Sequence, residues 1–340
     1  MGESGTARGR YLLVSLGATA AVLLLLLALN GWVMGPAMDG YYRRILLLVG
    51  INVTMAVSLN LINGFAGQFS LGHAGFMAVG AYTSAAFTLR AAPALKQALP
   101  FLTTSPMLGD ALLFAIALLL AGAVAAAAGW VVGLPSLRLR GDYLAIVTLG
   151  FGEIIRVVLL NIPAVGGPQG LFGIPPYTSF FWVALVAVAV VLLSRNIATS
   201  THGLAFLSVR EDEIAAEAMG VPTTRTKVLA FLIGAFFAGM GGALYAHQIQ
   251  FIQPGDFSFI QSILFVTMVV LGGTGSITGS VLAAAVLTYL PERLRDFQQY
   301  RMIVYSLLLI LLMLLRPQGI FGTREFSLDW ILRRRPVKGG

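Results

Sequence analysis

Long apolar stretches follow one another along almost the whole chain, and no other feature constrains its fold as strongly. A stretch of roughly 17–25 apolar residues can cross the hydrocarbon layer of a membrane as a helix. The sequence contains about ten such stretches; 58% of its residues are hydrophobic and only 11% are charged. A soluble domain could not cover so much apolar surface with so few charges. We therefore predict an all-α, polytopic membrane helix bundle that forms a single domain over residues 1–340.

The predicted spans cover residues 11–30, 43–62, 69–90, 110–133, 142–161, 178–195, 226–249, 257–272, 276–290 and 301–316. The ninth is short, and the eighth and ninth together also fit one broken element. A signal peptide is the alternative for the first, because Arg8 and Arg10 precede it. Its length and the lack of a clear small-residue cleavage site favour a retained anchor.

The basic residues predict the orientation of these spans. With ten spans and an inner N-terminus, the start, residues 134–141, residues 196–225 and the tail hold about twice as many Lys and Arg residues as the outer loops. This bias is typical of the cytoplasmic side. Nine spans would leave Arg333–Arg335 outside, which fits the rule less well. We therefore predict that both termini are cytoplasmic.

A polar helix is predicted within the cytoplasmic stretch, at residues 208–222. Ser208 and Glu211 have the spacing of a capping box, in which each side chain accepts from a backbone donor at the helix start. Gly220 can adopt the left-handed conformation that ends a helix, and Pro222 prevents the helix from resuming. A membrane protein that isolates such a helix offers it to something in the aqueous phase.

Two segments, Asn60–Gly75 and Leu271–Gly279, interrupt the apolar pattern with glycines and polar residues. Irregular backbone at membrane depth is tolerated where protein or a water-filled cavity surrounds it. One such break in each half of a transporter indicates a translocation route. The candidate path residues are Gln68, Ser70, His73, Thr274 and Ser276. The alternative is that the glycines only allow close helix packing, and Gly275 and Gly279 fit that pattern as well.

Two charges fall inside a predicted span. Glu153 lies near the middle of the fifth span and Arg156 follows three residues later, so both lie on one helix face and can pair. Intramembrane charges are costly and by default indicate function. A structural ion pair at a helix or subunit interface is the alternative, and we favour it.

Several chemical signatures are missing from the sequence. The three lysines, Lys96, Lys227 and Lys338, do not follow glycine, so the Gly-Lys pair of a phosphate-binding Walker A loop is absent. No metalloprotease motif, nucleophile elbow or cluster of metal ligands occurs, and there is no cysteine. We predict a protein that is not an enzyme, with no catalytic or metal site and no bound cofactor. Uphill transport would then draw energy from a partner or from an ion gradient.

Several runs resemble a known family of permeases. The stretch Ser58–Tyr82, the run Gly141–Arg156, the region Arg210–Phe231 and the closing Arg316–Gly322 are together similar to LivM-type permeases. These are one of the two membrane subunits of bacterial branched-chain amino acid ABC importers. The resemblance spans roughly residues 45–322. It implies a function as a permease subunit for branched-chain amino acids.

The resemblance also gives the cytoplasmic helix a role. The family carries a helix with glutamate, two alanines and a later glycine that couples to the ATPase. Ala215, Ala216 and Gly220 match this pattern, whereas Ile214 stands where the family has glutamate. The coupling residues that the resemblance implies are Glu211, Glu213, Ala215, Ala216, Glu217 and Gly220.

The implied complex lies in the bacterial inner membrane. It contains a second related permease, two ATP-binding subunits that use the ATP, and a periplasmic solute-binding protein. Urea, short amides and other small solutes are alternative cargoes. An ion-coupled secondary transporter with Glu153 as the titrating group and a purely structural membrane subunit are alternatives of another class. The capped helix favours the ATP-driven importer, because an ion-coupled carrier needs no docking ridge for an ATPase.

Overall fold

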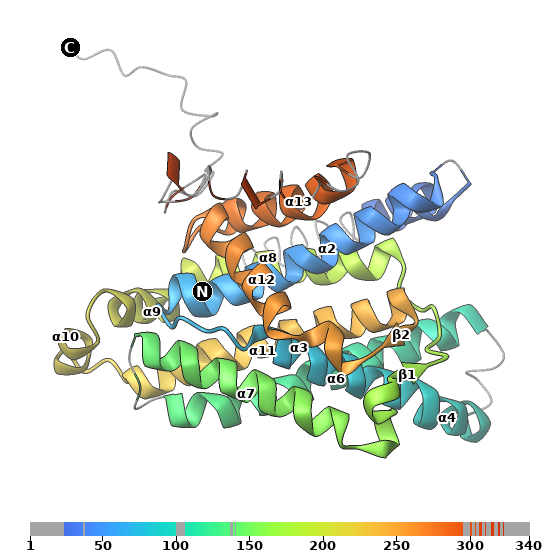
Figure 1. The fold of residues 1–340 in the computed structure, drawn as a ribbon, viewed down its shortest axis with the longest axis horizontal. Helices are drawn as coiled ribbons and strands as arrows, with labels where there is room; N and C mark the ends of the chain where they lie inside the picture. The colour runs from blue at the N-terminus through green and yellow to red at the C-terminus, as the bar shows by residue number, and fades with distance from the viewer. Residues whose placement is uncertain are drawn as a thin grey trace, which may run out of the picture.

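A computed structural model describes residues 24–36, 38–99, 106–136, 139 and 141–294, together with single positions between 300 and 322. These residues form a bundle of helices with one short two-stranded ribbon (Figure 1). Five helical segments among them are long and apolar enough to cross a membrane: Gly40–Phe65, Met107–Leu134, Asp142–Leu160, Phe180–Ala198 and Thr223–Ile249. The chain is therefore a polytopic helical membrane protein.

Five predicted spans coincide with these long helices. They are α2 (Gly40–Asn60, continued by a π-helical turn Leu61–Phe65), α6 (Pro106–Ser136), α7 (Asp142–Leu160), α8 (Phe180–Ala198) and α11 (Thr223–Ile249). The predicted spans 257–272 and 276–290 correspond to two shorter helices, α12 (Phe259–Gly272) and α13 (Ile277–Arg293). Of the predicted span 11–30, the described part begins within the helix Leu24–Met34. The predicted span 301–316 lies almost entirely outside the described residues, so the total of about ten stays a prediction.

The predicted span 69–90 begins later than expected. Helix α3 runs from His73 to Ala86 and continues through a π-helical turn, Phe87–Ala91, into α4 (Ala92–Ala98). Residues 66–72 are not helical. The N–H groups of Ser70 and Leu71, in this non-helical segment, donate to the side chains of Asn63 and Thr148.

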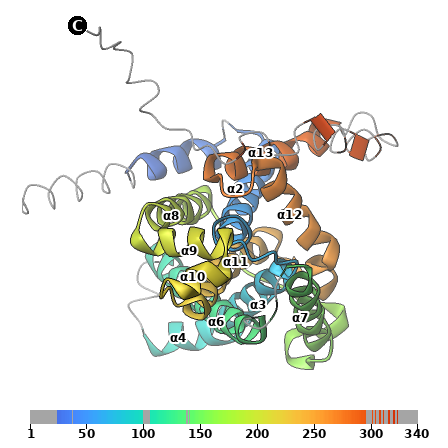
Figure 2. The same cartoon turned by 90° about the vertical axis from the view of Figure 1, so that its left-hand side faces the viewer.

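Helix α11 lies at the centre of the bundle and packs against α2, α3 and α6 (Figure 2). Small residues let these helices approach closely, as in many membrane bundles. A Cβ atom added at Gly80 of α3 would lie 2.1 Å from the carbonyl oxygen of Gly239 on α11. A Cβ atom at Gly242 would meet the carbonyl oxygen of Met77 at 2.0 Å. Glycine is thus required at the crossing of α3 and α11.

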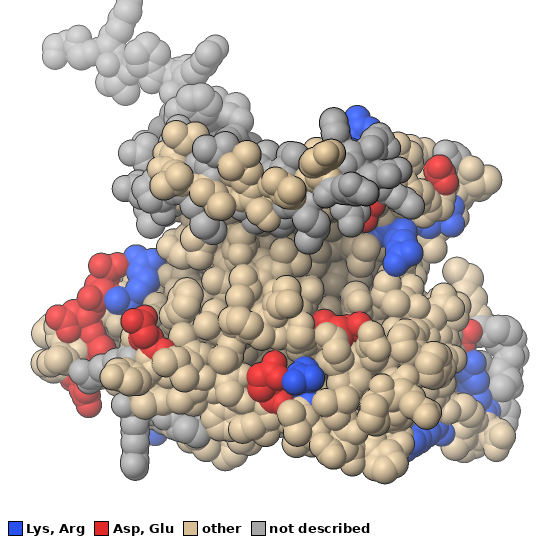
Figure 3. Space-filling view, viewed as in Figure 1, with Lys and Arg blue, Asp and Glu red and all other residues tan. Residues whose placement is uncertain are grey.

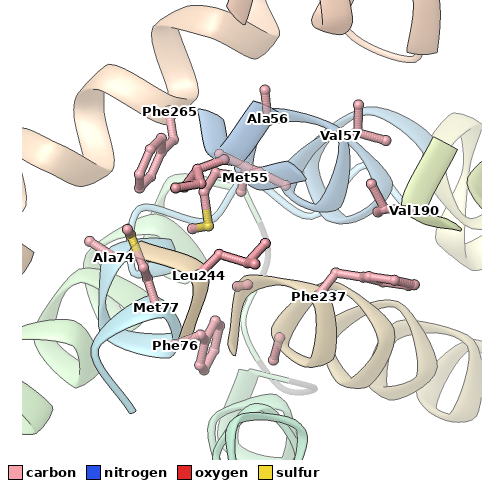
Figure 4. Packing of buried hydrophobic residues seen from close by; sticks show 14 of the residues in the cluster. Met55, Ala56, Val57, Ala74, Phe76, Met77, Val190, Phe237, Leu244 and Phe265 are labelled. Carbon is pink, nitrogen blue, oxygen red and sulfur yellow. The ribbon is translucent and has the colours of Figure 1, made fainter. Parts of the chain in front are cut away.

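The hydrophobic core lies between α2, α3, α11 and α12. Figure 4 shows Met55, Phe76, Leu244 and Phe265 converging there from these helices. The span of α2 is 72% buried, whereas the spans of α7 and α8 are only 22% buried. Helices α7 and α8 therefore expose broad apolar faces that lipid or a neighbouring subunit must cover.

The polar elements lie at opposite ends of the bundle. At one end β1 (Leu171–Phe172) pairs antiparallel with β2 (Phe251–Ile252). Short 3-10 turns flank this ribbon at Pro163–Val165, Gly167–Gln169 and Pro254–Phe257. At the other end lie two short helices, α9 (Thr201–Glu211) and α10 (Glu213–Ala218) (Figure 1).

Candidate translocation and coupling site

The first predicted break is a non-helical connection from α2 to α3. Asn63 holds it from within, because its side-chain oxygen accepts from the Ser70 N–H (3.1 Å) and its amide donates to the Ser70 carbonyl (3.4 Å). The Gln68 amide donates to the Ala66 carbonyl (3.1 Å). The ordered break therefore satisfies much of its own backbone, which membrane depth demands.

Neighbouring helices supply the remaining acceptors at the start of α3. The Thr148 hydroxyl on α7 accepts from the Leu71 N–H, and the Ser262 hydroxyl on α12 accepts from the Ala74 N–H (3.0 and 3.1 Å). The first amides of a helix lack partners within it, so Ser262 caps α3 from outside, while Thr148 holds the residue that precedes the N-cap Gly72. Sequence reasoning missed both residues, because a single hydroxyl in an apolar span gives no signal of its distant partner.

The predicted path residues of the first break are buried in this conformation. Ser70 and His73 are completely buried, and Gln68 is 7% exposed. His73 Nε2 lies 2.9 Å from the Ser58 hydroxyl, and its ring meets Phe76 and Phe265 edge-on. Each of these side chains is buried, so they do not line an open surface in this conformation.

The second predicted break is a tight turn between α12 and α13. Gly273 and Gly275 take positive φ angles of 108° and 90°, which favour glycine. A Cβ atom at Gly279 would lie 2.0 Å from the Gly272 carbonyl oxygen, so these two glycines also permit close packing of the helices. The Ser276 hydroxyl caps α13 by accepting from the Gly279 N–H (3.1 Å). Packing and chain reversal thus both operate here.

The two breaks touch each other. The Asn60 side-chain oxygen accepts from the Gly275 N–H (2.9 Å), and its amide donates to the Ser276 carbonyl (3.0 Å). A Cβ atom at Gly64 would lie 2.3 Å from the Gly275 nitrogen. Thr274 is exposed beside this contact, whereas Ser276 is buried. The Asn60 side chain thus connects the two breaks. In the sequence, only the presence of an asparagine in an apolar span hinted at this role.

The predicted cytoplasmic helix at 208–222 is two helices. Helix α9 ends at Glu211, and Asp212 adopts an extended conformation before α10. The Asp212 carboxylate accepts from the N–H groups of Ile214 and Ala215 (2.9 and 3.0 Å). The predicted capping box is wrong, because the Ser208 hydroxyl lies inside α9 and donates to the Ala205 carbonyl. Asp212 is the better cap since its carboxylate can serve two donors at once.

The end of α10 agrees with the expectation for Gly220. Gly220 has a φ of 84°, its N–H donates to the Glu217 carbonyl, and the Val221 N–H donates to the Ala216 carbonyl. This pair of bonds is a Schellman motif. A side chain at Gly220 would meet no atom within 4 Å. Glycine is therefore favoured at this position by backbone conformation alone.

The predicted coupling residues, on and next to α10, divide into buried and exposed ones. Glu213 turns inward and pairs with the buried Lys227 of α11 at 2.7 Å, and Ala216 is also buried. Glu211, Ala215, Glu217 and Gly220 are exposed. Two large apolar side chains stand beside them, Ile214 with 65% and Met219 with 84% of its surface exposed. Sequence reasoning did not single out these two as contact residues, although Ile214 was noted as a departure from the family pattern.

Arg210 joins α9 to the first break. Its Nη1 donates to the Gly64 carbonyl (3.1 Å), while Nε and Nη2 donate to the Glu211 carboxylate (3.1 and 2.6 Å). Gly67, with a φ of 65°, lies against the Arg210 side chain. Sequence reasoning placed Arg210 only among the cytoplasmic positive charges, because nothing local reveals a partner 146 residues away.

Glu153 and Arg156 form the predicted ion pair on α7. Arg156 Nε lies 2.7 Å from a Glu153 oxygen, and about a third of each side chain is exposed. Figure 3 shows red and blue atoms side by side over the middle of α7, away from the larger acidic group over α9 and α10. A small cleft of about 180 Å³ opens beside Glu153, lined also by Leu71, Gly75, Phe257 and Ser262. The described residues contain no group of three metal-ligating side chains.

The comparisons with known proteins decide the family. Residues 41–315 match the model of the branched-chain amino acid transport system permease component. The chain belongs to this family. This permease is 38% identical over 305 residues to the high-affinity branched-chain amino acid transport system permease protein LivM of Salmonella typhimurium, covering 79% of the chain and 67% of the relative. It is 37% identical over 308 residues to LivM of Escherichia coli, covering 80% and 68%.

A second type of relative matches over a shorter stretch. The permease protein LivH of Escherichia coli is 33% identical over 147 residues, which cover 42% of this chain and 47% of LivH. No solved structure matches the chain. The likeness to LivM therefore extends over far more of this permease than the likeness to LivH.

Proposed function

We propose that this permease is a membrane subunit of an ATP-driven importer for branched-chain amino acids. The observation that carries the proposal is the pair α9–α10, two short helices between the membrane helices α8 and α11 that present an exposed face at one end of a chain of this family. The transport function named for its relatives LivM supplies the substrate class. The permease binds no ATP itself, and its partners hydrolyse the nucleotide.

The exposed face of α9–α10 is the proposed docking surface for an ATP-binding subunit. Ile214 and Met219 offer apolar side chains, and Glu211, Asp212 and Glu217 surround them with negative charge. An apolar centre with a charged rim is typical of protein interfaces. The complementary ATPase surface is a groove with an apolar floor and basic residues at its edge. Glu213 is not part of this contact, because it pairs with Lys227.

The partners of the complex are a second related permease, two ATP-binding subunits and a periplasmic solute-binding protein, in a bacterial inner membrane. The existence of LivH beside LivM among the relatives supports two permeases. We place α9 and α10, and with them both termini, on the cytoplasmic side, as the basic residues predict. The ribbon β1–β2 then faces the binding protein.

The two breaks form the proposed route for the solute. Gln68, Ser70, His73, Thr274 and Ser276 provide polar groups of the kind that a zwitterionic amino acid requires. Most of them are buried here, so the route through this conformation is closed. ATP binding and hydrolysis in the docked ATP-binding subunits shift the population toward a conformation in which the breaks separate. The binding protein delivers the solute, so the route need not bind it tightly.

Reconstitution tests the function. The permease is co-expressed with the second permease and the two ATP-binding subunits, and the purified complex is placed in liposomes with the binding protein. We expect ATP-dependent uptake of leucine, isoleucine or valine, and no uptake with ATPase subunits unable to hydrolyse ATP. Urea and acetamide are assayed in parallel, and uptake of these alone would move the substrate to the alternative class. Uptake without any ATPase subunit would contradict the importer.

A further inference from the structure

We propose that Arg210 is the positioning residue that passes movement of α9 and α10 to both breaks at once. The inference rests on the proposed function, because it needs an ATPase that moves these helices. The guanidinium group of Arg210 belongs to the last turn of α9. In the proposal it controls the contact between the first break (residues 61–72) and the second break (residues 273–276).

The first step is the hydrogen bond from Arg210 Nη1 to the Gly64 carbonyl. Gly64 lies in the π-helical turn that ends α2, and the chain leaves the helix at Ala66. The last carbonyls of a helix lack donors within it, and for Gly64 the Arg210 side chain supplies one. A charge-assisted hydrogen bond is roughly twice as strong as a neutral one. The first break is thus held by a residue of the cytoplasmic helices.

The second step is the close approach of three glycines. A Cβ atom at Gly67 would lie 2.6 Å from Arg210 Cγ, and one at Gly275 would lie 3.1 Å from Arg210 Nη1. Gly64 and Gly275 are themselves in backbone contact. The guanidinium, hydrogen-bonded to the first break, therefore lies next to the second, with little room for a side chain at Gly67 or Gly275. A shift of α9 displaces both breaks, because closely packed groups do not slide freely past one another.

The third step concerns the hydrogen bonds that the same guanidinium makes to Glu211. Nε and Nη2 donate to Glu211, whose side chain is 71% exposed on the proposed docking surface. An exposed ion pair contributes little stability by itself. A basic groove on the ATPase competes with Arg210 for Glu211, whereas the bond to Gly64 is shielded. Docking therefore changes the orientation of Arg210 and, through it, the contact between the breaks.

The test compares Arg210→Gln with Arg225→Gln in the reconstituted complex. Arg225 is an exposed arginine near the start of α11, so its substitution makes the same charge change at the same end of the bundle. The readout is the amount of solute taken up per ATP hydrolysed. We expect this ratio to fall by about tenfold in Arg210→Gln, the scale of one charge-assisted hydrogen bond, and to be unchanged in Arg225→Gln.

Two further variants separate positioning from folding. Arg210→Lys keeps a donor for Gly64 but cannot hold Glu211 at the same time, so it should restore part of the ratio. Gly67→Ala leaves the charge in place and displaces the side chain, so it should lower the ratio as Arg210→Gln does. Normal uptake per ATP in Arg210→Gln would overturn the proposal. Loss of the assembled complex in Arg210→Gln, without rescue by lysine, would assign the residue to folding and also overturn it.

The failure of this proposal differs from the failure of the proposed function. If the unaltered complex takes up no solute with ATP, the importer itself is refuted. If that complex is active and the two arginine variants behave alike, the importer stands and Arg210 has no positioning role.

Discussion

At the scale of single residues, the backbone conformation at position 220 specifically favours glycine. Its φ of 84° is unfavourable for a side chain by roughly 1–2 kcal/mol, and more for a β-branched one. We expect Gly220→Val to deform the end of α10 and to weaken association with the ATP-binding subunit by about tenfold, while the permease still inserts in the membrane. Co-purification of the subunits and uptake in liposomes measure the effect.

Asparagine tolerates the left-handed conformation better than other residues, so Gly220→Asn is the matched control. It should remain close to the unaltered protein, because no atom lies within 4 Å of the added Cβ. Equal association of the valine and asparagine variants would show that the ATPase does not depend on this turn.

A second residue-scale test concerns the turn between α12 and α13. Gly279→Ala places a methyl group against the Gly272 carbonyl oxygen, and this backbone group cannot move aside without shifting the helix. We expect the free energy of unfolding to fall by ~1–3 kcal/mol, the usual cost of overpacking. Thermal denaturation in detergent measures it. Gly150→Ala is the control, because its Cβ would meet no atom within 4 Å. An equally stable Gly279→Ala variant would contradict the packing described here.

At the scale of elements, the breaks are testable by thiol labelling, since the chain has no cysteine of its own. Thr274→Cys, at an exposed position, should react with a water-soluble reagent in the resting state. Ser70→Cys, at a buried position, should be protected at rest and react only after the nucleotide state changes. Reactivity that is the same at both positions in every nucleotide state would mean that the glycines only pack helices and that the route lies elsewhere.

The sequence predicted the elements that local chemistry determines. The length of the apolar stretches predicted α2, α6, α7, α8 and α11, and Gly220 with the nearby Pro222 predicted the end of α10. It did not predict that Asp212 divides the cytoplasmic helix, because Ser208 and Asp212 are both good caps and only tertiary packing chooses between them. The partners of Asn60 and Arg210 are distant in sequence, so no local pattern contains them.

At the scale of the whole molecule, α7 is a membrane helix whose outer face the other described residues leave uncovered. Its span is 22% buried, and exposed Ile154, Val157 and Val158 surround the Glu153–Arg156 pair. An ion pair that faces hydrocarbon is energetically costly. We therefore expect the second permease subunit to pack against this face of α7. Arg156 already neutralises the Glu153 carboxylate within the chain, which does not suit a group that carries protons.

The energy source of transport follows from this arrangement. If ATP hydrolysis drives uptake, uptake in the reconstituted complex should stop when hydrolysis is blocked and continue when the proton gradient is collapsed at constant ATP. Glu153→Gln removes the charge and leaves Arg156 unpaired beside a partner, so it should lower the yield of assembled complex. The uptake per assembled complex should keep the same dependence on pH as the unaltered protein. An imposed pH gradient that drives uptake without ATPase subunits, and that fails in Glu153→Gln, would instead identify an ion-coupled transporter with Glu153 as its proton carrier.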